Sequence, residues 1–257
     1  MNIHQTLTCL KTISRKELKR LMRMWGQTLF PPLITSALYF IVFGTIVGSR
    51  FELKNGMNFI TFMTPGLIMM SVIMNSYTNV CSSFFIAKFQ KSIEEILVSP
   101  CSSNVIILGF VSGGIIRSSI IMFLILFVSS FFTDIKLAHP LLFFIFNLLT
   151  AVLFSLAGLL NAIFAKKFDD ISIVPTFILT PLSYLGGVFY SIEQLPQSWQ
   201  AVSKLNPIFY LINGLRYSFI GKSDINFYFS ITVLIALLCC LYILIFFLIE
   251  KGTGLKT

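Results

Sequence analysis

Residues Ile86–Pro100 read IAKFQKSIEEILVSP and form a short polar stretch between two long apolar runs. Because Pro100 cannot continue a helix, a helix here has to end before it. The apolar residues of the stretch recur at the spacing of one helical face: Ile86, Phe89, Ile93, Ile96 and Leu97. The spacing therefore predicts an amphipathic helix over residues 86–99, placed outside the membrane between two apolar segments.

Apolar runs flank this stretch along the whole chain, each long enough or nearly so to cross a hydrocarbon core, which needs about 20 helical residues. Five of them cover residues 29–48, 58–80, 104–130, 141–165 and 227–249. A sixth, at 171–190, contains Pro175 and Pro181, which a spanning helix tolerates when its neighbours re-satisfy the freed carbonyls. With 56% hydrophobic and 11% charged residues, the sequence predicts an all-α integral membrane protein with six spans, one domain over residues 1–257.

The distribution of Lys and Arg predicts the orientation, because positive residues near helix ends are retained in the cytoplasm. Twelve would then be cytoplasmic: Lys11, Arg15, Lys16, Lys19, Arg20, Arg23, Lys88, Lys91, Lys166, Lys167, Lys251 and Lys256. Six would lie in outer loops: Arg50, Lys54, Lys136, Lys204, Arg216 and Lys222. Both termini are expected in the cytoplasm. The net charge of +9 then reflects topology and attraction to anionic lipid, and it gives little reason to expect nucleic-acid binding.

The amino-terminal segment carries apolar residues against a cluster of Lys and Arg. Residues 12–27 are typical of a helix lying in the inner interface, although a solvated basic arm is the alternative. Two G-x-x-x-G patterns, Gly44–Gly48 and Gly109–Gly113, favour close packing of spanning helices.

Five cysteines, at 9, 81, 101, 239 and 240, are odd in number and contain no C-x-x-C pair. They indicate small packing residues rather than a disulfide framework or a zinc site.

Residues 191–224 differ from the other connections, because they are long and rich in aromatic side chains and are divided by Pro196 and Pro207. Two short helices half-sunk in the outer leaflet would place those aromatics at the interface. A single re-entrant hairpin reaching further into the membrane is the alternative.

Residues suited to catalysis are few. His4 and His139 are the only histidines, so no histidine-paired nucleophile or H-E-x-x-H motif can be built. Gly221-Lys222-Ser223 resembles the end of a P-loop, but Arg216 stands where its first glycine would be. Asp169-Asp170 matches the acidic start of a helix better than a cation site. The sequence therefore predicts no catalytic group, no metal site and no cofactor bound directly.

Arg117 lies inside the third predicted span, where an arginine costs about 2.5 to 3.5 kcal/mol unless it pairs or reaches a wet cavity. It either faces a transport path or gate, or snorkels toward one interface from a helix longer than the bilayer. Amides within the spans either join helices or contact a substrate, and the first role is favoured for each: Asn75, Asn79, Asn147 and Asn161.

Several longer stretches together resemble the permease subunits of ABC-2 type bacterial exporters, over nearly the whole chain. The matching stretches are PPLITSALYF from Pro31, PGLIMMSV from Pro65, SSFFIAKFQKSIEEILVSP from Ser82, TAVLFSLAGLLNAIFAKKFDDISIVPTFILTPLSYLGGVFYS from Thr150 and LNPIFYLINGLRYSF from Leu205.

The resemblance implies six spans, an amino-terminal interfacial helix, a coupling helix at 86–99 and two short outer-leaflet helices before the last span. It also implies a bacterial inner-membrane exporter in which two permease copies pair and each contacts a separate subunit that binds ATP and Mg²⁺. The implied ATPase contacts are Lys88, Phe89, Gln90, Lys91, Ile93, Glu94 and Glu95. Family members often carry a charged residue followed by glycine early in this helix, whereas this chain has Gln90-Lys91-Ser92. The family's substrates include polysaccharides, lipid-linked glycans and hydrophobic drugs, so the resemblance names no single cargo.

The same composition would also suit two other functions, a membrane-embedded enzyme and a passive channel or scaffold. A membrane-embedded enzyme would need convergent His, Asp, Glu or Ser residues, which the sequence does not supply. A passive channel or scaffold would need no ATP-binding partner, so dependence on nucleotide separates it from an exporter.

Overall fold

A long helix at the centre of the chain, α3 (Phe59–Phe89), organises the fold. The computed structural model describes residues 3–47, 58–135, 137–222 and 225–254. Within these ranges the chain is helical and has no strand. Around α3 lie α1 (Ile3–Arg23), α2 (Trp25–Ile41) with the π-helix η1 (Val42–Val47), α4 (Ser92–Val98), α5 (Ser103–Ser129) and α6 (Pro140–Phe164). They are followed by α7 (Asp170–Ile173), η2 (Val174–Leu179), α8 (Thr180–Leu185), η3 (Ile192–Gln194), α9 (Gln197–Leu205), α10 (Pro207–Ile220) and α11 (Phe227–Glu250).

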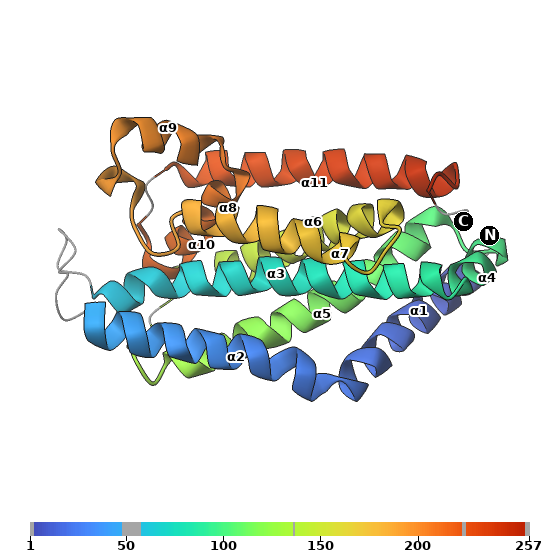
Figure 1. The fold of residues 1–257 in the computed structure, drawn as a ribbon, viewed down its shortest axis with the longest axis horizontal. Coiled ribbons are helices and arrows are strands. Elements are labelled where there is room, and N and C mark those ends of the chain that lie inside the picture. The colour runs from blue at the N-terminus through green and yellow to red at the C-terminus, as the bar shows by residue number, and fades with distance from the viewer. Residues whose placement is uncertain (1–2, 48–57, 136, 223–224, 255–257) are drawn as a thin grey trace.

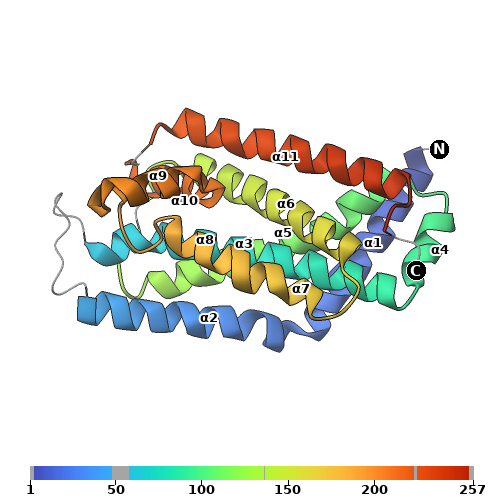
Figure 2. The same cartoon turned by 45° about the horizontal axis from the view of Figure 1, so that its top comes forward.

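Helix α3 is buried along most of its length because α5, α6 and α10 pack around it. Small residues allow these approaches. A Cβ added at Gly158 of α6 would lie 3.1 Å from the carbonyl carbon of Tyr77, so only glycine lets α6 come this close to α3. Figures 1 and 2 show α2 and α11 on opposite sides of the bundle.

Five helical segments are long and apolar enough to cross a membrane: Trp25–Gly44, Phe59–Phe89, Ser103–Ser129, Pro140–Phe164 and Phe227–Glu250. The sixth predicted span, 171–190, is shorter than expected, because its apolar helix covers Asp170–Leu185. A π-helical turn widens it from Val174 to Leu179, and the Pro175 carbonyl accepts from both the backbone nitrogen and the hydroxyl of Thr180, the latter at 2.8 Å. The all-α membrane fold expected from the sequence is confirmed. Gly48, which ends the first predicted span, lies outside the described residues.

The start of α1, helix α4 and the end of α11 gather at one end of the bundle, and α9 lies at the other (Figure 1). This end therefore brings together several of the segments that their charge assigned to the cytoplasm, namely the start of α1, the connection from α3 to α4 and the end of α11. Arg50, Lys54, Lys136 and Lys256, which the charge argument also used, lie outside the described residues.

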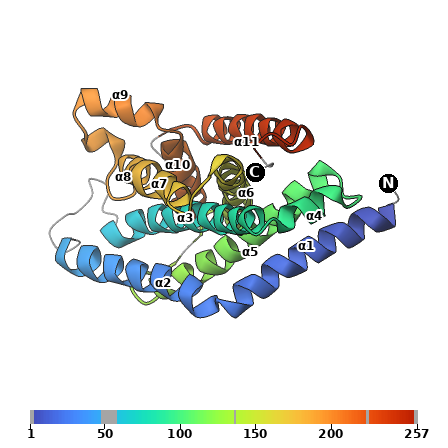
Figure 3. The ribbon, with the colours of Figure 1, turned by 45° about the vertical axis from the view of Figure 1, so that its right-hand side comes forward.

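The amino-terminal helix differs from its prediction over 12–27. Helix α1 ends at Arg23, the chain leaves helical geometry at Met24, and Trp25 begins α2. Figure 3 shows α1 running along α5. A Cβ added at Gly109 would lie 2.6 Å from Ile13 Cγ2, so the G-x-x-x-G pattern at 109–113 receives α1 instead of another spanning helix. Helix α1 is thus part of the packed bundle rather than a free basic arm.

Residues 191–222 contain two short helices, α9 and α10, which follow each other directly at Asn206; residues 223–224 lie outside the described residues. Helix α9 exposes Trp199 and Leu205, whereas α10 is buried against α3, α6 and α11. Arg216 of α10 is only 2% exposed, with its guanidinium 3.9 Å from the Phe62 ring centre. Its assignment to an outer loop is therefore wrong, because it belongs to the packed interior.

The cysteines also differ in part from the prediction. Cys9 of α1 and Cys101, in the connection between α4 and α5, form a disulfide across 92 residues of sequence. Cys81 is buried in α3 as a packing residue, and Cys239 and Cys240 are exposed on α11.

Candidate functional site

The stretch predicted as one helix over 86–99 is two helices. Helix α3 continues to Phe89, and α4 begins at Ser92. Between them Lys91 adopts a left-handed conformation with φ of 58°, which favours glycine over residues with a Cβ. Members of the family that the sequence resembles, the ABC-2 type exporter permeases, often carry a glycine in this segment. The break turns α4 away from the α3 axis, so the two halves do not share one helical face.

Two of the residues predicted to contact an ATPase are buried within the chain. Lys88 is 8% exposed, and its Nζ donates to the carbonyls of Ile163 at 2.6 Å and Ala165 at 3.0 Å. It therefore binds carbonyls that the end of α6 leaves without helical partners. Ile93 is 1% exposed and packs into the core. The prediction that Lys88 and Ile93 contact the ATPase is therefore wrong, because a contact residue has to be accessible to the partner.

The remaining predicted contact residues, Phe89, Gln90, Lys91, Glu94 and Glu95, are exposed. Phe89 has an aromatic neighbour that the sequence did not reveal. Phe168, in the connection between α6 and α7, lies with its ring centre 5.2 Å from that of Phe89 and is also exposed. We name these six residues the α3–α4 corner. It presents two aromatic rings, two carboxylates and one ammonium at the end of the bundle.

A buried ionic network joins α1 to α3. Glu17 is 1% exposed, accepts a hydrogen bond from the Ser83 hydroxyl at 2.5 Å, and lies 3.4 Å from the Arg20 guanidinium. Arg20 Nη2 donates to the side-chain oxygen of Asn79 at 2.9 Å and to its carbonyl at 2.8 Å. Burial raises the pKa of the Glu17 carboxyl, although Arg20 and Ser83 oppose the rise. Asn79, for which the sequence favoured joining helices over contact with a substrate, holds α1 in this network.

Asn161 also joins helices. Its side-chain nitrogen donates to the Asp170 carbonyl at 3.4 Å and to Cys81 Sγ at 3.5 Å, so it connects α6 with α7 and α3. The Asp170 carboxylate accepts from the backbone nitrogens of Lys166 at 2.8 Å and Lys167 at 2.9 Å. The carboxylate thus orders the connection before α7, and Asp170 lies in the first turn of that helix, as predicted for an acidic helix start.

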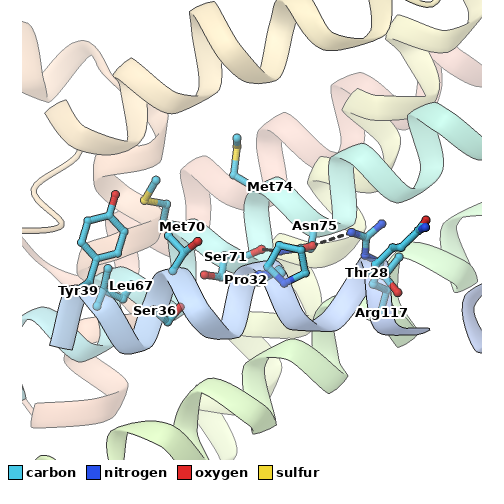
Figure 4. A pocket seen from close by; sticks show the side chains of 13 residues that line it. Thr28, Pro32, Ser36, Tyr39, Leu67, Met70, Ser71, Met74, Asn75 and Arg117 are labelled. Carbon is cyan, nitrogen blue, oxygen red and sulfur yellow. Dashed lines mark hydrogen bonds between the residues drawn. The ribbon is translucent and has the colours of Figure 1, made fainter. Parts of the chain in front are cut away.

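Arg117 and Asn75, the two possible path residues that lie on α5 and α3, are brought together. Arg117 Nη2 of α5 donates to the Asn75 side-chain oxygen of α3 at 2.9 Å. Both line a cavity of about 290 Å³ between α2, α3 and α5, here named the Arg117 cavity. Figure 4 shows Arg117 and Thr28 at one end of the cavity and Tyr39 at the other. Because Thr28 belongs to the first turn of α2, Arg117 lies in the middle of one predicted span but beside the start of another.

The family model of the ABC-2 type transporter matches residues 8–220. This match extends from α1 to the last residue of α10 and covers more than half of the chain. The chain belongs to the ABC-2 type transporter family. The resemblance predicted from the sequence is therefore confirmed for this permease, which crosses the membrane several times.

Individual relatives agree with the family match. The permease is 52% identical over 256 residues to the inner membrane transport permease YadH of Escherichia coli strain K12, across 99% of this chain and 100% of that protein. The same values hold for the YadH of Shigella flexneri. Nodulation protein J of Rhizobium meliloti strain 1021 is 22% identical over 212 residues, which are 82% of this chain and 79% of that protein.

Four residues of the permease were missed or misplaced as site residues by sequence reasoning. Arg20 was counted only as a cytoplasmic positive charge and Arg216 as an outer-loop charge, while Glu17 and Phe168 received no role. The Glu17–Arg20 spacing of three residues is a detectable signal, because it places opposite charges on one helical face. Phe168 and Arg216 carry no comparable signal, since their neighbours come from distant segments.

Proposed function

We propose that this chain is the non-catalytic membrane subunit of an ATP-driven exporter in the bacterial inner membrane. A separate subunit binds and hydrolyses ATP with Mg²⁺, and the permease docks it through the α3–α4 corner. Both termini and this corner face the cytoplasm. The single observation that carries the proposal is the exposed corner itself, an aromatic and charged surface at the end of a bundle that is otherwise largely apolar.

The corner is suited to transmit force. It continues directly from α3, the most buried helix, and Ile93 anchors α4 in the core. Lys88 ties the same region to the end of α6. A partner that moves the corner therefore acts on α3 and α6 together. The name of the similar protein YadH, an inner membrane transport permease, supports the same membrane and the same general role.

Two copies of the chain are proposed to enclose the path. The sequence has no internal repeat, so one chain supplies one wall, and a two-fold related copy supplies the other. The cargo is a glycan, a lipid-linked molecule or a hydrophobic compound.

Copurification tests the docking surface. A tagged permease is expressed with an ATP-binding subunit from an adjacent reading frame that carries a P-loop. Burying a large apolar side chain stabilises by about 1.5 to 3 kcal/mol, so Phe89→Asp combined with Phe168→Asp should lower the yield of the partner at least tenfold. Trp199→Asp is the matched control, because Trp199 is an exposed aromatic residue on α9 at the other end of the bundle.

The permease variants should insert and elute at the size of the unmodified permease. Partner yield that is unchanged by the double substitution, or lowered equally by Trp199→Asp, would place the contact elsewhere. Labelling of single cysteines introduced at Gln90, Lys167 and Lys204 tests the orientation. Gln90 and Lys167 should be protected in intact cells and Lys204 accessible; accessible Gln90 would end the argument for the corner.

A further inference from the structure

We propose that the Arg117 cavity binds the anionic head group, phosphate or carboxylate, of an amphiphile whose apolar chain lies along α2 and α3. That this amphiphile is also the exported cargo rests on the proposed function, whereas its binding does not. The proposal is based on the charge of Arg117, the shape of the cavity and the chemistry of its walls.

The charge of Arg117 has no counterion among the residues that the structure describes. The hydrogen bond to Asn75 joins it to a neutral amide, and Arg117 Nε is buried without a partner. The charged residue that most affects it is Arg20, which has the same sign and is itself paired with Glu17. A buried guanidinium without a counterion is unfavourable, and a planar fork of donors matches phosphate and carboxylate. The site therefore favours an anion.

The walls of the cavity are mostly apolar, and Arg117, the one charged residue among those that line it, lies at one end. Arg117, Asn75 and Thr28 lie at one end, and Figure 4 places Leu67 and Tyr39 toward the other. Further lining residues between or beside these ends include Pro31, Pro32, Met70 and Met74. Methionine side chains adapt to different apolar shapes. An anionic head at Arg117 with an apolar chain directed toward Tyr39 satisfies both ends.

The volume limits the size of the occupant. About 290 Å³ lies at the small end of the range of about 300 to 1,000 Å³ that is typical of ligand pockets. This space holds a small head group and part of an alkyl chain, but it does not enclose a bulky glycan. The arginine end also lies near the junction of α1 and α2, because Thr28 at this end donates its hydroxyl hydrogen to the Met24 carbonyl at 2.7 Å. A head group located at the end of the first span therefore reaches Arg117 without crossing the whole apolar layer.

Equilibrium binding of radiolabelled dodecyl phosphate to the permease in phosphatidylcholine nanodiscs tests the proposal without an ATPase. Arg117→Gln removes the charge but keeps a polar side chain, and it should weaken binding by at least tenfold. Met70→Trp fills the cavity without altering charge and should weaken binding to a similar extent. Lys204→Gln removes one positive charge from exposed α9 and should leave binding unchanged.

Competitors identify which part of the probe is recognised. Unlabelled dodecyl phosphate should displace the label, while inorganic phosphate and dodecyltrimethylammonium should not at equal concentration. If inorganic phosphate displaced the label with equal potency, the cavity would be a site for free anions, and the proposal that it binds an amphiphile would be overturned. If dodecyltrimethylammonium displaced the label, or if a folded Met70→Trp variant bound it fully, the assignment of the binding site to the Arg117 cavity would be overturned. Because no ATPase is present, these failures would leave the docking proposal intact.

Discussion

Replacing Lys88 by Met should destabilise the permease without removing a partner contact. Lys88 Nζ donates to two carbonyls at the end of α6, those of Ile163 and Ala165. The substitution leaves two buried acceptors without a partner, at about 1 to 3 kcal/mol each, but it also removes the cost of burying an ammonium. We therefore expect a net loss of about 2 to 4 kcal/mol of unfolding free energy.

Thermal unfolding in detergent measures this effect. At roughly 2 °C per kcal/mol for a chain of this length, such a loss should lower the midpoint by about 4 to 8 °C. Lys91→Met is the matched control, because Lys91 is exposed three residues further along and has no side-chain hydrogen bond in the described structure. Equal midpoints for the two variants, or loss of the ATP-binding partner from a Lys88→Met permease of normal stability, would refute a structural role for Lys88.

Two further predictions concern the α3–α4 corner and α1. Lys91→Gly should raise the unfolding free energy by about 1 kcal/mol in the same thermal assay, because glycine adopts a φ of 58° without a Cβ penalty, whereas Lys91→Ala should give no gain. Burial raises the folded-state pKa of Glu17, so its contribution to stability is complete below the unfolded pKa, about 4.5, and is lost as pH rises through the folded pKa. The midpoint should therefore rise as pH is lowered toward 4.5, and Glu17→Gln should flatten that change; an unaltered pH profile would contradict it.

The spans were predictable because the signal is local. Long apolar runs mark α2, α3, α5, α6 and α11, and even the interrupted segment around Pro175 and Pro181 was identified as membrane-embedded. The end of that segment was misplaced, because the apolar residues after Leu185 continue into a turn. Composition cannot distinguish an apolar turn from an apolar helix.

The α3–α4 corner was predicted only in part, because one backbone conformation changes the direction of the chain. Helical spacing placed Phe89 and Ile93 on one face, but the left-handed Lys91 separates them, so that Phe89 is exposed and Ile93 is buried. Lys88 illustrates a second limit: its partners lie 75 and 77 residues away. The polar character of Arg117 and Asn75 within spans was visible, whereas their pairing depended on the packing of α3 against α5.

Helix α1 is fixed at several points along its length. Ile13 occupies the space that Gly109 leaves open, Glu17 lies against Gly113, and Arg20 is held by Asn79. Its 21 residues extend about 31 Å, from the end of the bundle that carries α4 to the start of α2 beside the Arg117 cavity. Helix α1 therefore connects the α3–α4 corner with the entrance of the Arg117 cavity. While these contacts hold, the two regions cannot shift independently.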